Sequence, residues 1–398
     1  VVLIGILVLI FYFSGPRGME TAIKESTYKY QTAYWLEEVG RTLNSFKLVG
    51  STRLPILRAD KLLQRYIEFR SKHFSVLVFQ YKVMVAFKVF IITSLLLAGS
   101  LLLINDQISI GQFVAAEVII VLVVNSVEKL ILSLETVYDT LVSVEKLGHI
   151  MDLELEHSGP GEKIIQSQPE GLKFGLENVV FQPLDSSEPL LKGVSLTIMP
   201  GRKVVVTGES GSGKSAMMAL FSGLYEEYEG KVLVNDLSLE YINLEKYRGM
   251  VGDFLELQQL FHGTIKENIL MGRDYEQDQV DFILNLVGLK DYIYQLPQGL
   301  ETMLQPEGKG LSKTIAHQML LARGFIGQPK ALIMENVLSY VDPQIKEKVV
   351  DYIMKGSWTL LIVSNDETVQ KMADEVIYME NGRLIFQGSF EEYKKIKK

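Results

Sequence analysis

The stretch VVVTGESGSGKSAMM, residues 204–218, decides the fold of this chain. Within it, Gly208, Gly213, Lys214 and Ser215 fit the pattern G-x-x-x-x-G-K-[S/T] of a phosphate-binding loop. A β-branched run precedes the loop and helix-forming residues follow it, which is the strand–loop–helix setting that such a loop requires. The stretch therefore predicts an α/β P-loop NTPase domain.

The residue types in the loop explain how it would hold a nucleotide. Glycines let backbone N–H groups turn inward around a β-phosphate, and the N-terminus of the following helix favours negative charge. Lys214 is expected to reach the terminal phosphates, and the Ser215 hydroxyl to ligate Mg²⁺. The loop residues predicted to contact the nucleotide are Gly208, Glu209, Ser210, Gly211, Ser212, Gly213, Lys214 and Ser215.

The pattern on either side of the loop divides the chain into two domains. From residue 171 to residue 398, short β-branched runs alternate with amphipathic stretches, which is typical of an α/β domain. Residues 1–157 instead alternate apolar runs with long polar stretches that look helical. Between the two, SGPGEKIIQSQPE at residues 158–170 is rich in Gly, Pro, Ser and Gln and predicts a linker.

The first domain carries candidate membrane helices. Hydrophobic residues make up 47% of the chain and mean hydropathy is +0.17, which is high for a soluble protein. Residues 83–104 and 110–132 are each long enough to cross a bilayer, and the short segment 105–109 makes them an antiparallel hairpin. We interpret the apolar run at residues 1–13 as the remaining half of another span, which would make the sequence a fragment. We therefore predict a partial α-helical membrane domain with about three transmembrane segments.

The segment 14–82 is rich in Lys and Arg, and basic loops tend to stay cytoplasmic. Apolar residues recur at helical spacing between Leu36 and Phe46, which favours two long cytoplasmic extensions of the membrane helices with a turn where Pro55 interrupts the pattern. A separate soluble helical hairpin is the alternative. Glu117 in the last span is either a functional intramembrane carboxylate or a residue near the outer end that faces water or a sibling helix.

Composition excludes several classes of function. A net charge of −8 and an isoelectric point near 5.4 argue against nucleic acid as a partner, because phosphate backbones need a basic surface. The absence of cysteine excludes disulfides, thiolate catalysis and zinc–thiolate sites. The five histidines lack the close spacing of a metal site.

Residues 171–398 resemble the ATP-binding domain of ABC transporters almost throughout. The stretches that carry the resemblance, in the family's order, are FGLENVVF with the loop, GKVLVNDLSL, LFHGTIKENILMG, YIYQLPQGLETML, residues 311–323 and ADEVIYMENGRLIFQGSFEEY. Upstream, ISIGQFVAAE and SVEKLGHIMDLE resemble the last membrane helix of exporter-type half-transporters and the segment that leaves it. The resemblance implies a membrane domain fused to an ATP-binding domain, ATP and Mg²⁺ as ligands, and a turn near Pro55 that docks on an ATP-binding domain.

Two positions that normally contact nucleotide depart from the family pattern. The aromatic residue that stacks on adenine falls at Pro183, which has no π face, and nearby Phe181 is expected in the core. The glutamine that senses Mg²⁺ and the γ-phosphate aligns with Glu256, although Gln258 or Gln259 would serve if the loop shifts.

The metal and catalytic positions are altered as well. The aspartate that supports Mg²⁺ becomes Glu335, so the predicted metal ligands are Ser215, Glu335 and Glu256. The carboxylate that polarises water becomes Asn336, which cannot accept a proton, and the switch histidine becomes Asn365. No catalytic residue is therefore expected to be intact.

The signature motif of the family, Leu-Ser-Gly-Gly-Gln, becomes LSKTI at residues 311–315. Ser312 keeps a hydroxyl at a helix start and is a predicted ATP contact, but the two glycines that permit close approach to phosphate are gone. In this family two ATP-binding domains sandwich two ATP molecules, each held by one chain's loop and the other chain's signature. Asp342 keeps the acid of the loop that crosses that interface.

These substitutions define the expected function. We expect an ATP-binding subunit of an ABC-type exporter, paired with a second half-transporter, whose own hydrolytic site is impaired. A homodimer should hydrolyse ATP very slowly or not at all, whereas an intact partner could keep one working site. The alternatives are a silent regulatory or scaffolding subunit and an ordinary ATPase in which Glu335 acts as base.

The expected location is a bilayer, specifically a bacterial inner (cytoplasmic) membrane, with the ATP-binding domain in the cytoplasm. No nucleic-acid partner is expected. The sequence does not identify the transported substrate.

Overall fold

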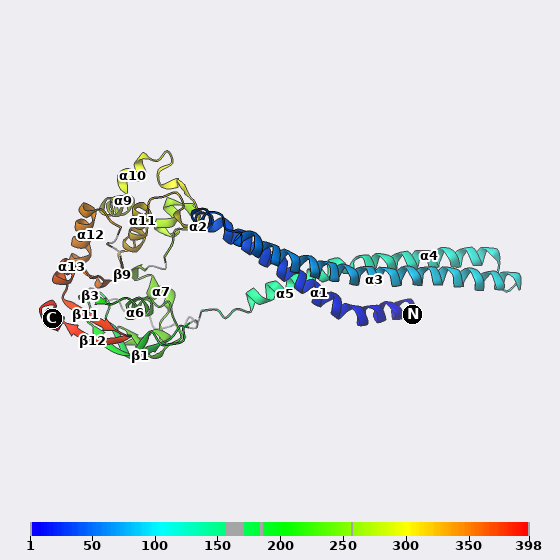
Figure 1. Cartoon of the computed structure of the whole chain (residues 1–398), viewed down its shortest axis with the longest axis horizontal. Helices are drawn as coiled ribbons and strands as arrows, with labels where there is room; N and C mark the ends of the chain where they lie inside the picture. Colours follow the sequence, from blue (N-terminus) through cyan, green and yellow to red (C-terminus); the bar gives the residue numbers. More distant parts are fainter. Residues whose placement is uncertain are drawn as a thin grey trace. The chain divides into compact units, whose positions relative to one another are not determined.

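A computed structural model describes residues 2–156, 171–183, 186–255, 258–336, 338 and 340–396. The chain divides into two compact units, residues 1–155 and 156–398, each of which is described by itself. The first unit is helical, and the second is built around β-sheets (Figure 1). The predicted linker at residues 158–170 lies outside the described residues.

The helical unit consists of α1 (Val2–Arg41), α2 (Leu43–Val49), α3 (Leu54–Ile104), α4 (Ile110–Leu132) and α5 (Leu134–Met151). Helices α1 and α3 have 40 and 51 residues and pack along each other. Within the polar segment 14–82, α1 continues to Arg41 and α3 begins at Leu54, with α2 and a turn between them.

The turn between α1 and α3 lies just before Pro55. Pro55 itself is in the first turn of α3, where the backbone N–H that proline lacks would have no partner within the helix. The Pro55 carbonyl accepts a hydrogen bond from the Trp35 indole at 3.0 Å. The Arg58 guanidinium stacks over the same indole at 4.3 Å from the ring centroid. Gly50, with φ of 84°, ends α2 in a conformation that favours glycine.

Helices α3 and α4 form the predicted hairpin. Lys88, the one charged residue within 83–104, pairs with Glu128 at 2.8 Å and with the Asn125 amide oxygen at 3.2 Å. Among the described helices, α3 alone is long and apolar enough to cross a membrane, and α4 carries a shorter apolar stretch, Ile110–Ser126. The spans expected at residues 1–13 and 110–132 stay predictions.

The second unit contains twelve described strands in three sheets. Their bounds are β1 (Phe174–Phe181), β2 (Leu191–Ile198), β3 (Lys203–Gly208), β4 (Glu229–Val234), β5 (Leu237–Ser238), β6 (Val251–Phe254), β7 (Gly263–Thr264), β8 (Met303–Leu304), β9 (Ala331–Glu335), β10 (Thr359–Val363), β11 (Glu375–Glu380) and β12 (Arg383–Gly388). The largest sheet has the order β12-β11-β3-β10-β9-β6, and every pairing in it is parallel except that of β11 with β12. A smaller antiparallel sheet has the order β2-β1-β4-β5, and β7 pairs with β8.

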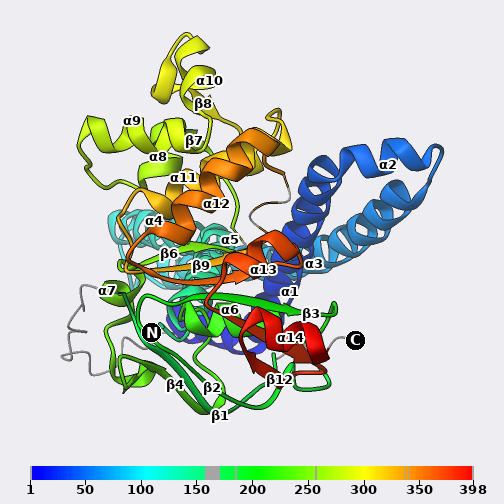
Figure 2. The same ribbon diagram turned by 90° about the vertical axis from the view of Figure 1, so that its left-hand side faces the viewer.

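Helices cover both faces of the largest sheet. Their bounds are α6 (Lys214–Phe221), α7 (Leu244–Arg248), α8 (Ile265–Leu270), α9 (Gln277–Leu286), α10 (Lys290–Gln295), α11 (Lys313–Phe325), α12 (Pro343–Lys355), α13 (Glu367–Met372) and α14 (Phe390–Ile396), with short 3₁₀ turns at η1 (Leu239–Tyr241), η2 (Gly299–Glu301) and η3 (Pro306–Gly308). Helix α6 lies between the largest sheet and the antiparallel sheet, and α11 and α12 lie on the opposite side (Figure 2).

Successive residues of the central strands point alternately into two hydrophobic cores, because side chains in a strand alternate between its two faces. In β3, Val204 and Val206 join the core with α6, whereas Val205 joins the core with α11 and α12. All five residues of β9 are buried, which agrees with the apolar run of its first four residues, 331–334. Because β3, β10 and β9 are adjacent and parallel, their carboxyl ends lie together at one edge of the sheet.

Candidate nucleotide-binding site

The predicted phosphate-binding loop connects β3 to α6, at the carboxyl edge of the parallel sheet. Gly208, Gly211 and Gly213 adopt φ values of 146°, 79° and 93°, a region that side chains disfavour. A Cβ on Gly208 would lie 2.2 Å from the Met379 carbonyl oxygen, and one on Gly213 would lie 2.6 Å from the Leu190 oxygen. The loop therefore needs glycine at both ends.

Lys214 begins α6 and turns its side chain back over the loop. Its ammonium donates hydrogen bonds to the carbonyl oxygens of Gly208 at 3.0 Å and Glu209 at 2.6 Å, and to the Ser212 hydroxyl at 3.2 Å. Burial lowers the pKa of Lys214, and the nearby Glu335 carboxylate opposes that shift. The Lys214 cation is thus held against the backbone of the glycine-containing loop.

The Ser215 hydroxyl donates a hydrogen bond to Glu335 Oε1. Glu335 ends β9 and is only 5% exposed, so the parallel sheet brings a carboxylate to the first turn of α6. Hydroxyl and carboxylate oxygens are ligands that Mg²⁺ prefers, and Mg²⁺ commonly takes only one or two protein ligands beside phosphate and water. This pair fits such an ion, although no group of three or more His, Asp or Glu among the described residues forms a closed metal cage.

Asn336 follows Glu335 directly and is exposed, with φ of 51°. Asparagine tolerates this left-handed conformation better than most residues. Its side chain offers an amide in place of a carboxylate, so it cannot take a proton from water.

Asn365 lies beyond the end of β10, and its amide oxygen accepts a hydrogen bond from the Thr207 hydroxyl at 2.7 Å. Thr207 directly precedes Gly208, so Asn365 is held beside the start of the loop. The remaining amide N–H groups of Asn365 can donate hydrogen bonds but cannot carry a positive charge.

Ser312 lies at the N-cap of α11, where its hydroxyl accepts a hydrogen bond from the Ile315 backbone N–H at 3.2 Å. No hydrogen bond links it to residues 208–215 in the described part of the chain. Asp342 likewise caps α12 by accepting from the Gln344 N–H at 3.0 Å.

The remaining candidates fall in different settings. Phe181 is buried, as expected, and packs against Tyr225 with ring centroids 4.6 Å apart, whereas Pro183 is partly exposed. Glu256 lies outside the described residues. Gln258, the alternative to it, donates from its amide to the Asp253 carboxylate at 2.8 Å.

His317 makes several contacts near Asn336 that the sequence did not predict. Its ring lies edge-on to Phe254 and Tyr340, with centroids 4.6 and 5.2 Å apart, and it hydrogen-bonds the Asn336 backbone. The Lys313 ammonium lies 5.7 Å from the centroid of the same Tyr340 ring. The spacing of four residues between Lys313 and His317 on a helix was the available signal, because such residues share a face.

Comparison with known families tests the assignment. The family described as "ABC transporter" matches residues 191–338, a range that includes the loop and the Glu335–Asn336 pair. Residues 191–338 therefore form a domain similar to that of ABC transporters. The match implies ATP as the nucleotide and confirms the predicted α/β P-loop NTPase class.

Related ABC proteins come from fungi and bacteria. The "ABC multidrug transporter atrD" of Emericella nidulans is 31% identical over 243 residues, covering 59% of this chain and 18% of that protein. The "Leukotoxin export ATP-binding protein LtxB" of Aggregatibacter actinomycetemcomitans is 27% identical over 303 residues, covering 75% of this chain and 42% of that protein. The "ATP-dependent lipid A-core flippase" of Burkholderia orbicola is 26% identical, covering 72% and 48%. The chain thus spans less than half the length of these relatives.

The fold also matches a solved exporter. The structure titled "Structure of a bacterial Atm1-family ABC exporter with ATP bound" aligns with a TM-score of 0.85 and 18% identity, covering 100% of this chain and 71% of that one. This similarity confirms that the ABC chain has an exporter-type half-transporter fold. The exporters among its relatives support an integral membrane protein.

Proposed function

We propose that this chain is the ATP-binding subunit of an ABC exporter and supports ATP-coupled transport while its own hydrolytic site is impaired. Residues 1–157 would form the partial membrane domain, 158–170 the linker and 171–398 the ATP-binding domain. The exporters among the relatives and the exporter fold support the transport role.

The observation that most directly supports the proposal is that the predicted Mg²⁺ and phosphate ligands lie beside a residue that cannot act as a base. Lys214 and Ser215 occupy the loop, and Ser215 contacts the buried Glu335. The next residue, Asn336, lacks a proton-accepting group. ATP would therefore bind through the loop residues 208–215, with Mg²⁺ held by Ser215 and Glu335, and with Glu256 as a further candidate ligand.

The lost groups lower the rate of hydrolysis rather than the affinity for ATP. General acid–base assistance is typically worth about 10²–10⁴ in rate, and Asn336 removes it. Asn365, held by Thr207, retains a hydrogen-bond donor without the positive charge that a histidine could supply. We therefore expect the site to bind ATP and turn it over slowly.

A partner subunit would complete the cycle. Ser312 and the altered residues Lys313 and Thr314 would face the ATP of a second half-transporter, as the family's sandwich arrangement implies. Two copies of this chain would combine two impaired sites, so the proposal favours a heterodimer with an intact partner. The bacterial relatives support a bacterial cytoplasmic membrane with the ATP-binding domain in the cytoplasm.

Measuring nucleotide binding and hydrolysis on the same purified full chain, alone and with its partner, tests this proposal. We expect an ATP-dependent rise in Tm for the chain alone, with little phosphate release. With the partner, transport should require both Lys214 and Ser312. Phosphate release by the isolated chain at the rate of an ordinary ABC exporter would refute impaired hydrolysis, and transport that survives Lys214→Ala would instead indicate a silent scaffold.

A further inference from the structure

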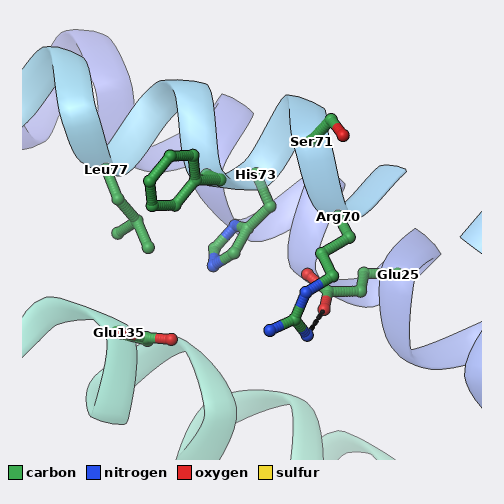
Figure 3. Close-up of a pocket in the computed structure, with 7 residues that line it drawn as sticks. Glu25, Arg70, Ser71, His73, Leu77 and Glu135 are labelled. Carbon is green, nitrogen blue, oxygen red and sulfur yellow. Dashed lines mark hydrogen bonds and ion pairs between the residues drawn. The ribbon is translucent and has the colours of Figure 1, made fainter. Parts of the chain in front are cut away.

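The helical unit contains a cavity of about 220 Å³ that the ATP site does not use. It lies between α1, α3 and α5, and Figure 3 shows His73 and Arg70 directed from α3 toward α5. Its lining includes Glu25 of α1, Arg70, His73, Phe74 and Leu77 of α3, and Glu135 of α5. Residues 70–77 precede the predicted span at 83–104, so the cavity lies outside that span.

Hydrogen bonding determines which nitrogen of His73 carries a proton. His73 is 6% exposed, and its Nδ1 lies 3.3 Å from both the Gly18 carbonyl oxygen and the Thr21 hydroxyl. A carbonyl oxygen only accepts, so Nδ1 must donate. The Thr21 hydroxyl donates its own proton to the carbonyl oxygens of Arg17 and Gly18 at 2.9 Å, which leaves its oxygen free to accept from Nδ1. In the neutral ring, Nε2 is consequently a hydrogen-bond acceptor, and no described residue hydrogen-bonds to it.

The charges that line the cavity sum to one negative charge when His73 is neutral. Glu25 and Arg70 form an ion pair at 3.1 Å, with the Glu25 side chain 17% exposed and that of Arg70 63% exposed. Glu135 is exposed at the cavity edge and has no ion-pair partner among the described residues. The cavity therefore offers one uncompensated carboxylate together with the Nε2 acceptor.

From these features we infer that the cavity binds a small organic monocation with an ammonium head and an apolar body. An ammonium group has three donors and no acceptor, which complements Nε2 of His73 and the carboxylates of Glu25 and Glu135. Phe74 and Leu77 supply apolar surface for the body, and an aromatic face also attracts a cation. A bare metal ion fits less well, because the described His, Asp and Glu residues form no group able to hold one.

The cavity exists only because three helices meet. Glu25, Arg70 and Glu135 are separated by 45 and 65 residues in the chain (70 − 25 and 135 − 70). Binding at this site does not depend on the proposed ATP-coupled transport, because the lining residues belong to the helical unit alone. Direct binding to the full chain thus tests the site separately from transport.

The test uses three fluorinated probes of nearly equal size, followed by fluorine NMR with the full chain in lipid nanodiscs. 4-Fluorophenethylamine is the cation, 2-(4-fluorophenyl)ethanol the neutral control and 3-(4-fluorophenyl)propanoate the anion. We expect saturable binding of the amine with a Kd of about 1 mM, as ligands of this size commonly give. The alcohol and the carboxylate should bind at least fivefold more weakly, because they do not complement the net negative charge.

Charge variants locate the binding. Glu135→Gln should weaken amine binding about five- to tenfold, because it removes the uncompensated charge near a partly solvated site. Arg70→Gln should strengthen it by a similar factor, since Glu25 then loses its partner. Glu145→Gln, an exposed change ten residues further along α5, is the matched control and should leave Kd unchanged. Equal binding of the amine and the alcohol, or equal effects of Glu135→Gln and Glu145→Gln, would overturn the proposal.

Discussion

Restoring a carboxylate at position 336 is the sharpest test of why the ATP site should be slow. Asn336→Glu places a proton acceptor directly after Glu335, at the position that we propose for the missing base. The charge of buried Glu335 nearby should raise the pKa of the new carboxyl, which brings it closer to the range of an effective base. We therefore expect hydrolysis to increase.

The size of the increase follows from what else stays altered. General-base assistance is worth about 10²–10⁴ in rate, and we expect the lower end, about 10²-fold, because Asn365 and the signature residues remain changed. The backbone at position 336 has φ of 51°, a conformation that costs most residues about 1–2 kcal/mol. Asparagine tolerates it better, so the variant should lose about 1 kcal/mol of stability.

Asn336→Gln is the matched control, because it has the same length and the same backbone strain but no proton acceptor. Phosphate release from Mg-ATP should be measured for both variants, with Lys214→Ala added in each to subtract contaminating ATPases. Comparable rates for Asn336→Glu and Asn336→Gln would show that the missing base does not limit hydrolysis, and the reasoning from Asn336 would then be wrong.

Three further predictions concern the same unit. Lys214→Ala should abolish most of the ATP-dependent rise in Tm, worth about 2.7 kcal/mol at 100 times Kd, whereas exposed Lys231→Ala should preserve it in scanning fluorimetry. Gly213→Ala should weaken ATP binding at least tenfold by calorimetry, because its Cβ would lie 2.6 Å from the Leu190 oxygen at φ of 93°. Burial lowers the pKa of His317 below the ordinary 6.5, so the neutral ring's contribution to stability is present above that pH and is lost as pH falls through the folded pKa. His317→Gln should flatten this acid-side loss in urea titrations between pH 7 and about 5, and an unchanged pH profile would contradict it.

Local patterns predicted the parts of the fold that depend on neighbours in the chain. The β-branched run before the loop is β3 and the residues after it are α6, because a strand, a glycine turn and a helix start each have a short-range signal. Pro55 marked the turn between the long helices, although the structure places it inside the first turn of α3. The short helix α2 was not predicted.

Local sequence patterns could not predict the contacts at the site between residues that are far apart in the chain. Glu335 could be named as a metal ligand by resemblance, but only the order of β3, β10 and β9 brings it to Ser215. The contact of His317 with the Asn336 backbone joins a helix to the end of a separate strand, and neither local sequence indicates the other. The tautomer of His73 likewise depends on a carbonyl 55 residues away.

By itself, the sequence determined that this chain has a P-loop motif, a helical region before it, and amides at positions 336 and 365. These properties reside in residue identity and spacing, which folding does not alter. The tertiary structure alone decided which oxygens meet at Ser215, which ring supports Asn336, and which charges line the cavity around His73. Packing sets these contacts because it joins segments far apart in the chain, and hydrogen-bond and charge interactions act only at short range.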